Sequence, residues 1–318
     1  MISPLERGGT RTIVVALGGN ALQPPGGHGG IHEQFAHTRE SLGVIVALAK
    51  AGWRVAVVHG NGPQIGDELL RNELARSRRP PLPLGVLVAS TAGWIGYMIQ
   101  QSLRNALDHA GVRRPVVSII TQVLVDADDL EPRKPIGHTM SREQAEELAA
   151  TLGWDIAPVE GGWRRIVASP RPYSVVESDQ IERLLDAGTI VIACGGGGTP
   201  VYRDERLGLE GVDAVVDKDR AACILARELR AEVLLILTNV DGAYRGYGTA
   251  AQQLIERLPA QEAAALLQSG EFGAGSMGPK VEAAIDFVRN GGRRAIIARL
   301  ERGLDAVEGR TGTTIVPD

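Results

Sequence analysis

The hydrophobic residues of the chain gather in short runs that are separated by longer stretches of mixed character. Residues 13–17 read IVVAL, an apolar and largely β-branched run that stops at two glycines. A short apolar run bounded by turn residues is typical of a strand that is buried in a sheet. Runs of the same kind predict further strands, at 54–58, 116–120, 190–193, 233–237 and 294–298.

The segments between these runs carry hydrophobic residues at helical spacing. They predict helices at 33–51, from Pro63 onward, and at 90–110, 217–229, 259–267, 279–289 and 302–308. Strands that alternate with helices favour an α/β fold around a mainly parallel sheet.

The alternation of apolar runs and helical segments is interrupted between residues 126 and 175. The stretch DADDLEPRKPIGHT is charged and interrupted by prolines. Ser141 and Gln144 then fit a capping box, which predicts a helix that runs to about Leu152. A short strand is predicted at 165–168. We predict that residues 126–175 form an insertion or a lid.

The bulk composition narrows the class of protein. The chain has 318 residues, a formal net charge of −4 and a pI of about 5.9, so no basic excess points to nucleic acid or an anionic membrane. Cys194 and Cys223 lie in a glycine loop and a predicted helix and do not suggest a disulfide framework. No signal-peptide core and no membrane-spanning run is evident. We expect one large domain or two modest lobes, in a reducing cytoplasm.

Three predicted strands end in glycine-rich turns, at residues 18–20, 60–62 and 195–198. In open α/β sheets, ligands bind at the carboxyl ends of the strands. Exposed backbone N–H groups and helix N-termini at that edge suit anions. One such turn is usually only a turn, but three predict a ligand-binding edge. His59 precedes the second turn, and its role is undecided.

The stretch from Gly273 to Gly278 matches the pattern G-x-G-x-x-G. The dinucleotide-binding form of this pattern follows directly on a strand, whereas here a helix and a turn precede it. Pro279 also stands where a P-loop would have its lysine. Neither common phosphate-binding loop is therefore predicted.

Lys218 and Lys280 each lie at the start of a predicted helix, and Pro279 suits the first helical position. Cations are disfavoured in the first helical turn, where the helix dipole is positive. Two such lysines therefore predict an anion between them, such as a polyphosphate. Asp217 and Asp219 could hold Lys218 in place or help to hold Mg²⁺, and Asp217 could equally be a plain helix N-cap.

Lys134 lies between two prolines in the predicted lid. The prolines stiffen the local backbone, so this lysine could be carried over a site on a rigid arm. Spacing alone favours the simpler alternative, an exposed loop lysine.

Eight short motifs follow one another along almost the entire chain. They read ALGGNAL, VVHGNGPQIG, KPIG, GWRRIVASP, CGGGGTPV, VDKD, LTNVDG and GSMGPKVEAA. Together they resemble the carbamate kinases of the amino-acid-kinase superfamily, from about residue 12 to residue 316. Each motif alone is modest evidence for the family, whereas the eight motifs in this order are specific to it.

The resemblance implies a three-layer α/β/α sandwich around a mainly parallel open sheet, with a small inserted lid. It implies an N-terminal extension at residues 1–11 and an acceptor-binding half at residues 12–125 and 176–200. The lid would comprise residues 126–175, and the nucleotide-binding half would comprise residues 201–318. It also implies a homodimer that uses Mg²⁺ and ATP or ADP.

The resemblance assigns roles to the residues that match its motifs. The acceptor and the transferring phosphoryl group would lie against Gly18, Gly19, Asn20, Gly60 and Asn61. Catalysis would rest on three lysines and the carboxylate that organises them, which are Lys134, Lys218, Lys280 and Asp219. The nucleotide would contact Gly196, Gly197, Thr238, Asn239, Asp241, Met277 and Lys280, and no metal ligand is directly assigned.

These parts suit phosphoryl transfer, in which a protein aligns donor and acceptor and neutralises the charge of the transferring group. The resemblance implies Mg²⁺-dependent transfer between carbamoyl phosphate and ADP, in the ATP-forming direction. One alternative is a kinase that acts on another small carboxylate or carbamate-like acid. A second alternative, a catalytically silent nucleotide-binding regulator, would be expected to have lost the lysines that are present here.

Three positions depart from the family pattern on the acceptor side. Gly85 and Ala92 replace an Asp and a Gln in a segment that carbamate kinases commonly share, and His37 stands in place of an Asn. If these positions line the acceptor pocket or the dimer face, the acceptor can differ from carbamate while the phosphoryl transfer is kept.

Overall fold

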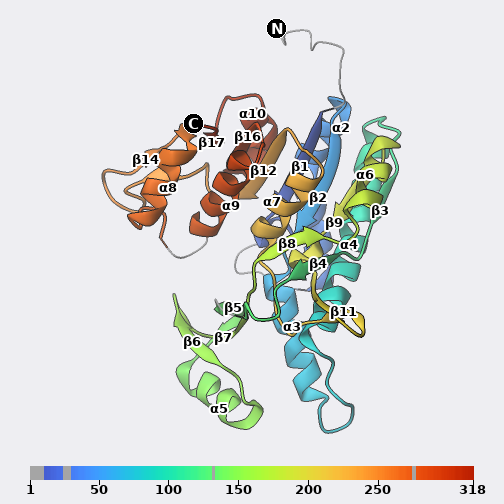
Figure 1. Ribbon diagram of the computed structural model, residues 1–318, viewed down its shortest axis with the longest axis vertical. Helices are drawn as coiled ribbons and strands as arrows, with labels where there is room; N and C mark the ends of the chain where they lie inside the picture. Colours follow the sequence, from blue (N-terminus) through green and yellow to red (C-terminus); the bar gives the residue numbers. More distant parts are fainter. Residues whose placement is uncertain (1–10, 24–29, 131–132, 274–276) are drawn as a thin grey trace.

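The computed structural model describes residues 11–23, 30–130, 133–273 and 277–318. Its centre is an eight-stranded sheet with the strand order β15-β17-β16-β12-β1-β2-β9-β3 (Figure 1). These strands are β1 (Thr12–Leu17), β2 (Arg54–His59), β3 (Val116–Ser118), β9 (Ile190–Ala193), β12 (Val233–Thr238), β15 (Arg257–Pro259), β16 (Arg294–Arg299) and β17 (Thr313–Val316). Neighbouring strands are parallel except for the antiparallel pair β16 and β17. The predicted mainly parallel sheet is therefore confirmed.

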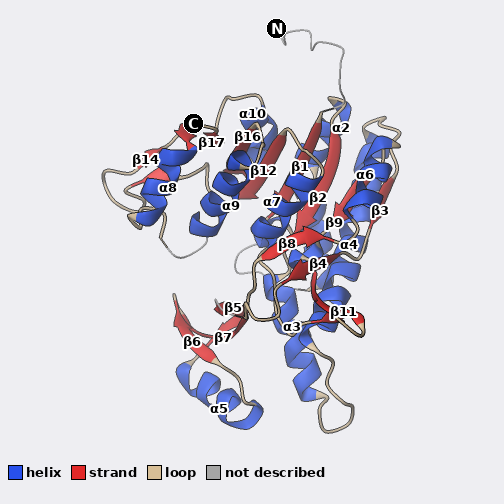
Figure 2. Cartoon of the chain, viewed as in Figure 1, coloured by secondary structure: helices blue, strands red, loops and turns tan. Residues whose placement is uncertain are grey.

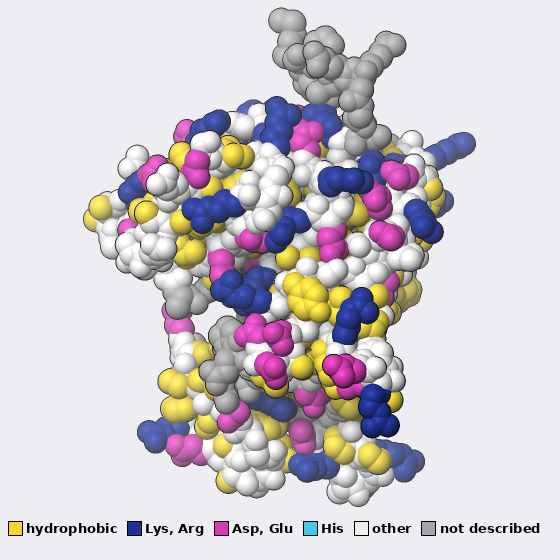
Figure 3. Space-filling view, in the orientation of Figure 1, with side chains coloured by type: hydrophobic (Ala, Val, Ile, Leu, Met, Phe, Trp, Pro, Cys, Tyr) yellow, Lys and Arg dark blue, Asp and Glu magenta, His cyan; other side chains and the backbone are white. Residues whose placement is uncertain are grey.

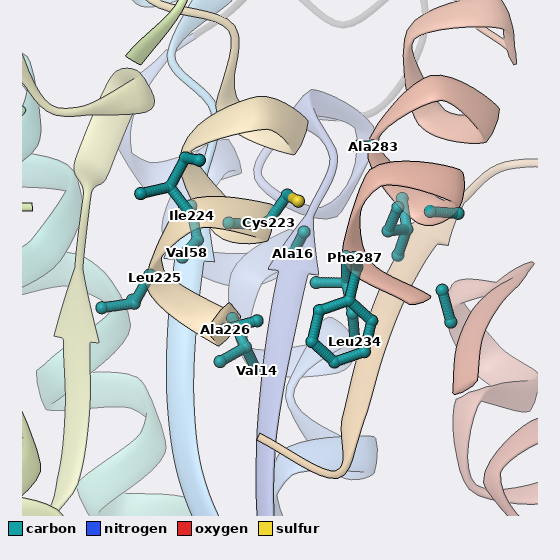
Figure 4. Packing of buried hydrophobic residues seen from close by; sticks show 14 of the residues in the cluster. Val14, Ala16, Val58, Cys223, Ile224, Leu225, Ala226, Leu234, Ala283 and Phe287 are labelled. Carbon is teal, nitrogen blue, oxygen red and sulfur yellow. The ribbon is translucent and has the colours of Figure 1, made fainter. Parts of the chain in front are cut away.

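Helices cover both faces of this sheet (Figure 2). Val14 and Ala16 of β1 lie in an apolar cluster with α6 (Ser178–Asp186), α7 (Lys218–Glu228), α8 (Ala260–Gln268) and α9 (Met277–Arg289). Figure 4 shows this side of the sheet, with Phe287 of α9 packed close to the strands. Ile13 and Val15 point to the opposite face because side chains alternate along a strand. They join a second cluster with α2 (Gly43–Lys50), α4 (Leu84–His109) and α10 (Gly303–Val307), which confirms the three-layer sandwich.

Two helices differ from their predicted bounds. The segment predicted as one helix at 33–51 forms α1 (Ile31–Ser41) and α2, which are separated at Leu42. Gly43 follows the buried Leu42, and a glycine weakens a helix at that point. Helix α4 begins at Leu84 rather than near residue 90, because the Leu84 N–H donates a 2.9 Å hydrogen bond to Asp213, which is distant in sequence.

Helix α3 (Gly62–Leu74) begins immediately after the second glycine turn and has Pro63 in its first turn, as predicted. None of the helices in the described part of the chain combines the length and the apolar character that crossing a lipid bilayer requires. On the face drawn in Figure 3, cationic and anionic side chains are interspersed and do not form one large field of a single sign.

The prediction missed a second, smaller sheet beside the main one. Its strand order is β11-β10-β4-β8, with β4 (Gln122–Val125), β8 (Pro172–Val175), β10 (Thr199–Asp204) and β11 (Gly208–Gly211). A two-stranded hairpin, β13 (Tyr244–Arg245) and β14 (Gln253–Leu254), was also missed. These strands are short, most of them carry Gly, Pro or charged residues, and the apolar run of β4 has only three residues, so the sequence marks them weakly. Strand β3 also ends at Ser118, before the predicted end at residue 120.

A third sheet projects away from the layered body (Figure 1). It consists of β5 (Arg133–Met140), β6 (Ile156–Val159) and β7 (Gly162–Ala168), with α5 (Arg142–Leu152). The capping box is confirmed, since Ser141 and Gln144 exchange side-chain to backbone hydrogen bonds at the start of α5. We call residues 133–168 the lid; they lie within the segment 126–175 that the sequence marks as an insertion.

The base of the lid is anchored to the body by apolar packing. Ile136 of β5 and Val167 of β7 are buried in a cluster with Ile65 of α3, Val215 and residues of α4. The backbones also approach closely, because a Cβ at Gly66 would lie 2.2 Å from the Cα of Gly137. The polar sequence of the segment predicts few apolar ties and motion as a unit. The described lid contributes two side chains to this cluster, so its apolar ties are few, as expected, and they lie at its base.

Candidate active site

A cleft of about 690 Å³ opens at the carboxyl ends of three neighbouring strands, β1, β2 and β9, with the base of the lid on one side. It brings together residues that are far apart in the sequence. The predicted residues that line it are Gly19, Gly60, Asn61, Lys134, Gly196, Lys218, Asp219 and Lys280. All three glycine-rich turns therefore meet at one edge of the sheet, as their positions after buried strands predict.

The second and third glycine turns pack directly against each other. Asn61 is buried, and its amide donates a 2.8 Å hydrogen bond to the hydroxyl of Thr91 on α4. Gly196 has a φ of 69°, and a Cβ at this position would lie 2.4 Å from the Asn61 amide nitrogen. Both the backbone conformation and the space therefore require glycine at residue 196.

Asp219 lies between two lysines at the converging N-termini of α7 and α9. The Lys218 ammonium is 2.5 Å from one carboxylate oxygen, and the Lys280 ammonium is 3.1 Å from the other. The side chains of Lys218, Lys280 and Asp219 are only 12%, 11% and 3% exposed. Lysines that bind an anion at a helix start are expected to be exposed, and that expectation is wrong for Lys218 and Lys280 because the shared carboxylate allows them to be buried.

Electrostatics at this cluster favour an anion. Burial lowers the pKa of the Lys218 ammonium, and the neighbouring Lys280 lowers it further, against the opposing effect of Asp219. Two ammonium groups share one carboxylate at the positive ends of two helices. The local excess of positive charge in a partly water-excluded site is what phosphate oxygens would neutralise.

Lys134 of the lid reaches the same helix end through Asp217. Its ammonium is 2.7 Å from Asp217 Oδ2, while Asp217 Oδ1 accepts hydrogen bonds from the Asp219 and Arg220 backbone N–H groups. Asp217 is thus both the N-cap of α7 and the partner of a lysine. Burial alone would raise the pKa of the Asp217 carboxyl, but Lys134 and Lys218 outweigh it and hold that pKa below its usual range.

The amino-acid composition gives a further indication of the importance of these lysines. The chain has 34 lysines and arginines, but only four of them are lysines. Three of the four line this cleft, and Lys50 is exposed at the end of α2. A chain that otherwise uses arginine keeps lysine where a compact ammonium is required, which points to the same three residues.

The other predicted nucleotide-binding residues lie outside the described lining of this cleft. Thr238 is the last residue of β12, the neighbour of β1, and Asn239 comes directly after it. Asp241 accepts a 2.7 Å hydrogen bond from Arg299. Met277 packs against the apolar cluster at the start of α9. The resemblance also assigns the stretch 272–280 to the nucleotide region, and residues 274–276 of this stretch lie outside the described residues.

The remaining predicted glycines flank the cleft. Gly18 follows the end of β1 and lies beside the Leu237 carbonyl group, and Gly197 lies against the backbone of Val216. Asn20 belongs to the 3-10 turn Gly19–Ala21 that follows β1.

The three departures from the family pattern lie at different distances from the site. Ala92 packs behind the third glycine turn, because a Cβ at Gly195 would lie 2.9 Å from the Ala92 Cβ. Gly85 lies in the first turn of α4, beside the Val212 carbonyl group. His37 lies on α1 in a separate cavity, beside Leu300 and Leu304. Ala92 is therefore the departure that is closest to the acceptor side.

His59 is buried beneath the site, a role that the sequence left undecided. Its Nδ1–H donates a 2.9 Å hydrogen bond to the Gly60 carbonyl group, and among the described residues its Nε2 has no partner. Complete burial lowers the pKa of the imidazole to about 4, against a smaller opposing effect of the bond to Gly60. The ring is therefore neutral at pH 7 and supports the second glycine turn.

This buried histidine predicts a pH dependence of stability. As the pH falls below about 6.5, the imidazole of the unfolded chain binds a proton before the imidazole of the folded chain can. We expect the free energy of unfolding to fall by up to about 3 kcal/mol between pH 6.5 and pH 4 from this residue. Urea unfolding of the parent and of His59→Asn, which keeps a donor near the Nδ1 position, measures the difference. Parallel pH profiles for the two proteins would contradict the assignment.

The sequence profile of the amino acid kinase family matches residues 11–299. The chain is 46% identical to the carbamate kinase of Pyrococcus horikoshii, over 96% of this chain and 99% of that protein. The solved structure of a carbamate kinase from Giardia lamblia bound to citric acid superposes with a TM-score of 0.91 at 38% identity, covering 97% and 99% of the two chains. The same Giardia lamblia enzyme bound to AMP-PNP gives a TM-score of 0.89 at 38% identity, again covering 97% and 99%. The chain therefore belongs to the carbamate kinases of the amino acid kinase family.

Proposed function

We propose that this protein transfers a phosphoryl group between carbamoyl phosphate and ADP, and that it forms ATP in the cell. The observation that carries the proposal is the convergence of Lys134, Lys218 and Lys280 on one cleft that is lined by glycine turns. Carbamate kinases of similar sequence, one of them solved with AMP-PNP, support the identity of the substrates.

The proposed chemistry needs positioning and charge neutralisation more than covalent catalysis. The transition state spreads negative charge over the phosphoryl oxygens, with the attacking and leaving oxygens in line. In our proposal Lys218 and Lys280 bind donor phosphates at the starts of α7 and α9, and Lys134 approaches the transferring group from the lid. The backbone N–H groups of the turns at Gly19 and Gly60 hold the acceptor side. Asp219 holds Lys218 and Lys280 in place before the substrates bind.

The carboxylates of the cleft do not suit a protein-bound metal. Both oxygens of Asp219 contact lysines, and those of Asp217 contact a helix N-terminus and Lys134. In the described part of the chain, no group of three or more His, Cys, Asp or Glu residues could hold a metal ion. We propose that Mg²⁺ is required and that it enters bound to the nucleotide phosphates, as is usual for this ion.

The test of the activity is ATP formation by the purified protein from carbamoyl phosphate and ADP. We expect turnover that requires Mg²⁺ and that exceeds the rate of a mixture without the protein. Acetyl phosphate serves as a second acyl phosphate. If the protein forms ATP from acetyl phosphate and ADP but not from carbamoyl phosphate and ADP, the carbamate assignment is wrong and the kinase class is retained. ADP binding without turnover on either substrate would favour the silent regulator.

A different acceptor within the same family is the second candidate. The observation that favours it is Ala92, which places a small apolar side chain behind the third glycine turn where carbamate kinases commonly carry a polar one. A screen of small carboxylates and carbamate-like acids with ATP and Mg²⁺ separates the two candidates.

We propose that the protein is a cytoplasmic homodimer, as the family resemblance implies. Light scattering over a range of dilutions tests the dimer, and a single species at the mass of one 33.8 kDa chain would contradict it.

A further inference from the structure

The two carboxylate oxygens of Asp217 serve two different partners. Oδ1 caps α7 by accepting hydrogen bonds from the Asp219 and Arg220 N–H groups, at 2.9 and 3.4 Å. Oδ2 accepts a 2.7 Å hydrogen bond from the ammonium of Lys134, which lies 83 residues earlier in the chain. The side chain of Asp217 is 19% exposed and that of Lys134 is 30% exposed, so the pair is partly shielded from water.

The surroundings of Lys134 restrict where its ammonium can go. Lys134 stands two residues before Ile136 on β5, and Ile136 is buried against α3 and α4. Pro135 separates the two residues and fixes the local backbone. The stem of the lysine side chain therefore starts from a fixed point, and its flexible end is tied to the N-terminus of α7.

We propose that Asp217 is a positioning residue for Lys134, which it holds at the N-terminus of α7 in the empty enzyme while it caps that helix with its other oxygen. The inference rests on the proposed phosphoryl transfer at this cleft. It assigns the carboxylate that precedes Lys218 to the lid lysine, whereas Asp219 serves Lys218 and Lys280.

The pairing with Asp217 orders the Lys134 side chain before the substrate binds. A free lysine loses rotamer freedom when it contacts a phosphoryl group, and a tethered lysine has already lost much of it. When phosphoryl oxygens enter the cleft, they compete with Asp217 Oδ2 for the same ammonium. Lys134 then moves over a short distance from one anion to another and does not search from solvent.

Two substitutions separate the role of Asp217 as the N-cap of α7 from its role as the partner that holds Lys134, which we call the tether. Asn and Ser are N-caps comparable to Asp, so Asp217→Asn and Asp217→Ser retain a cap for α7. Both remove the negative charge from Lys134, and Asn also places an amide donor where Oδ2 accepted a hydrogen bond. Asp217→Ala removes the cap and the tether together, so we expect the midpoint of thermal unfolding to fall clearly in this variant alone.

In kinetic terms, we expect Asp217→Asn to lower kcat about tenfold, the scale of a small misplacement of a group that contacts the reacting atoms. The ADP affinity measured by calorimetry should change by less than about threefold, because the donor phosphates contact other lysines. A double-mutant cycle with Lys134→Ala isolates the coupling. In the Lys134→Ala background, Asp217→Asn should change kcat by less than about twofold. An undiminished tenfold effect in that background would overturn the proposal.

A second measurement does not depend on activity. The chain has only four lysines, so acylation by N-hydroxysuccinimidyl acetate can be followed at each one by mass spectrometry. Release from Asp217 should raise the acylation rate of Lys134 by about threefold relative to the exposed Lys50, the scale of a partly exposed ion pair. Equal rates in the parent and in Asp217→Asn would overturn the proposal. If Asp217→Asn raises the acylation rate of Lys134 but the parent protein shows no phosphoryl transfer, the pairing of Asp217 with Lys134 is retained and the proposed reaction is rejected.

Discussion

Replacing Lys280 with Ala is expected to lower kcat by about 10²–10³-fold, the cost of losing one preorganised group that stabilises developing charge. The same result is expected for Lys218→Ala. Each residue places an ammonium at a helix start in the cleft, and in our proposal both contact the donor phosphates. We therefore also expect the ADP affinity measured by calorimetry to weaken in both variants.

The burial of these lysines adds an effect on stability. Each single variant leaves Asp219 with one lysine partner, so the free energy of unfolding should fall by less than the about 3–5 kcal/mol that follows from leaving a buried charge unpaired. Asp219→Ala, which leaves two ammonium groups facing each other, should be the least stable of the three variants. Lys50→Ala is the matched control, because Lys50 is exposed at the end of α2. A Lys280→Ala protein with normal unfolding and nearly full activity would show that the assigned role is wrong.

The central sheet and its ligand edge could be predicted because their signals are local. Buried parallel strands such as 13–17 and 233–237 read as short apolar runs, and a glycine turn follows directly on the strand that positions it. The second sheet could not be predicted in this way. Strands such as Pro172–Val175 and Thr199–Asp204 are short and include polar or charged residues, and the apolar run in Gln122–Val125 is only three residues long.

The charge network of the cleft could be predicted only in part. The motifs and helix starts identified Lys218, Lys280 and Asp219, but the pairing of Lys280 with Asp219 joins residues 61 positions apart. The pairing of Lys134 with Asp217 joins residues 83 positions apart, and spacing alone would have left Lys134 as a loop lysine. The first contact depends on the packing of α7 and α9 in one apolar cluster, and the second depends on the packing of the lid against α3. No local pattern encodes either arrangement. The scarcity of lysine is the signal in the sequence that could have supported all three residues.

The anchored base of the lid changes how Lys134 is expected to act. The sequence predicts a polar lid that swings as a unit and carries the lysine onto the phosphoryl group. In the structure, Ile136 and Val167 hold the base of the lid against the body, and Lys134 already lines the cleft. In our proposal, Lys134 therefore needs only a side-chain movement to contact a phosphoryl group in the cleft.

Replacing Lys134 with Ala is expected to reduce kcat by at least about 10²-fold, with ADP bound nearly as tightly as by the parent. In our proposal this ammonium contacts the transferring phosphoryl group, so its interaction is stronger in the transition state than in the bound ground state. Lys134→Arg should also be impaired, because a bulky planar guanidinium does not replace a compact ammonium on a fixed strand. The measurements are kcat and, by calorimetry, ADP affinity. His138→Ala is the control, since His138 also lies on β5 but contacts Asp67 of α3 and does not line the cleft. If His138→Ala keeps a near-parental kcat, the lower kcat of Lys134→Ala results from the loss of the ammonium and not from a general loosening of the lid. If ADP affinity collapses in Lys134→Ala while kcat survives, Lys134 binds the nucleotide and does not stabilise the transition state.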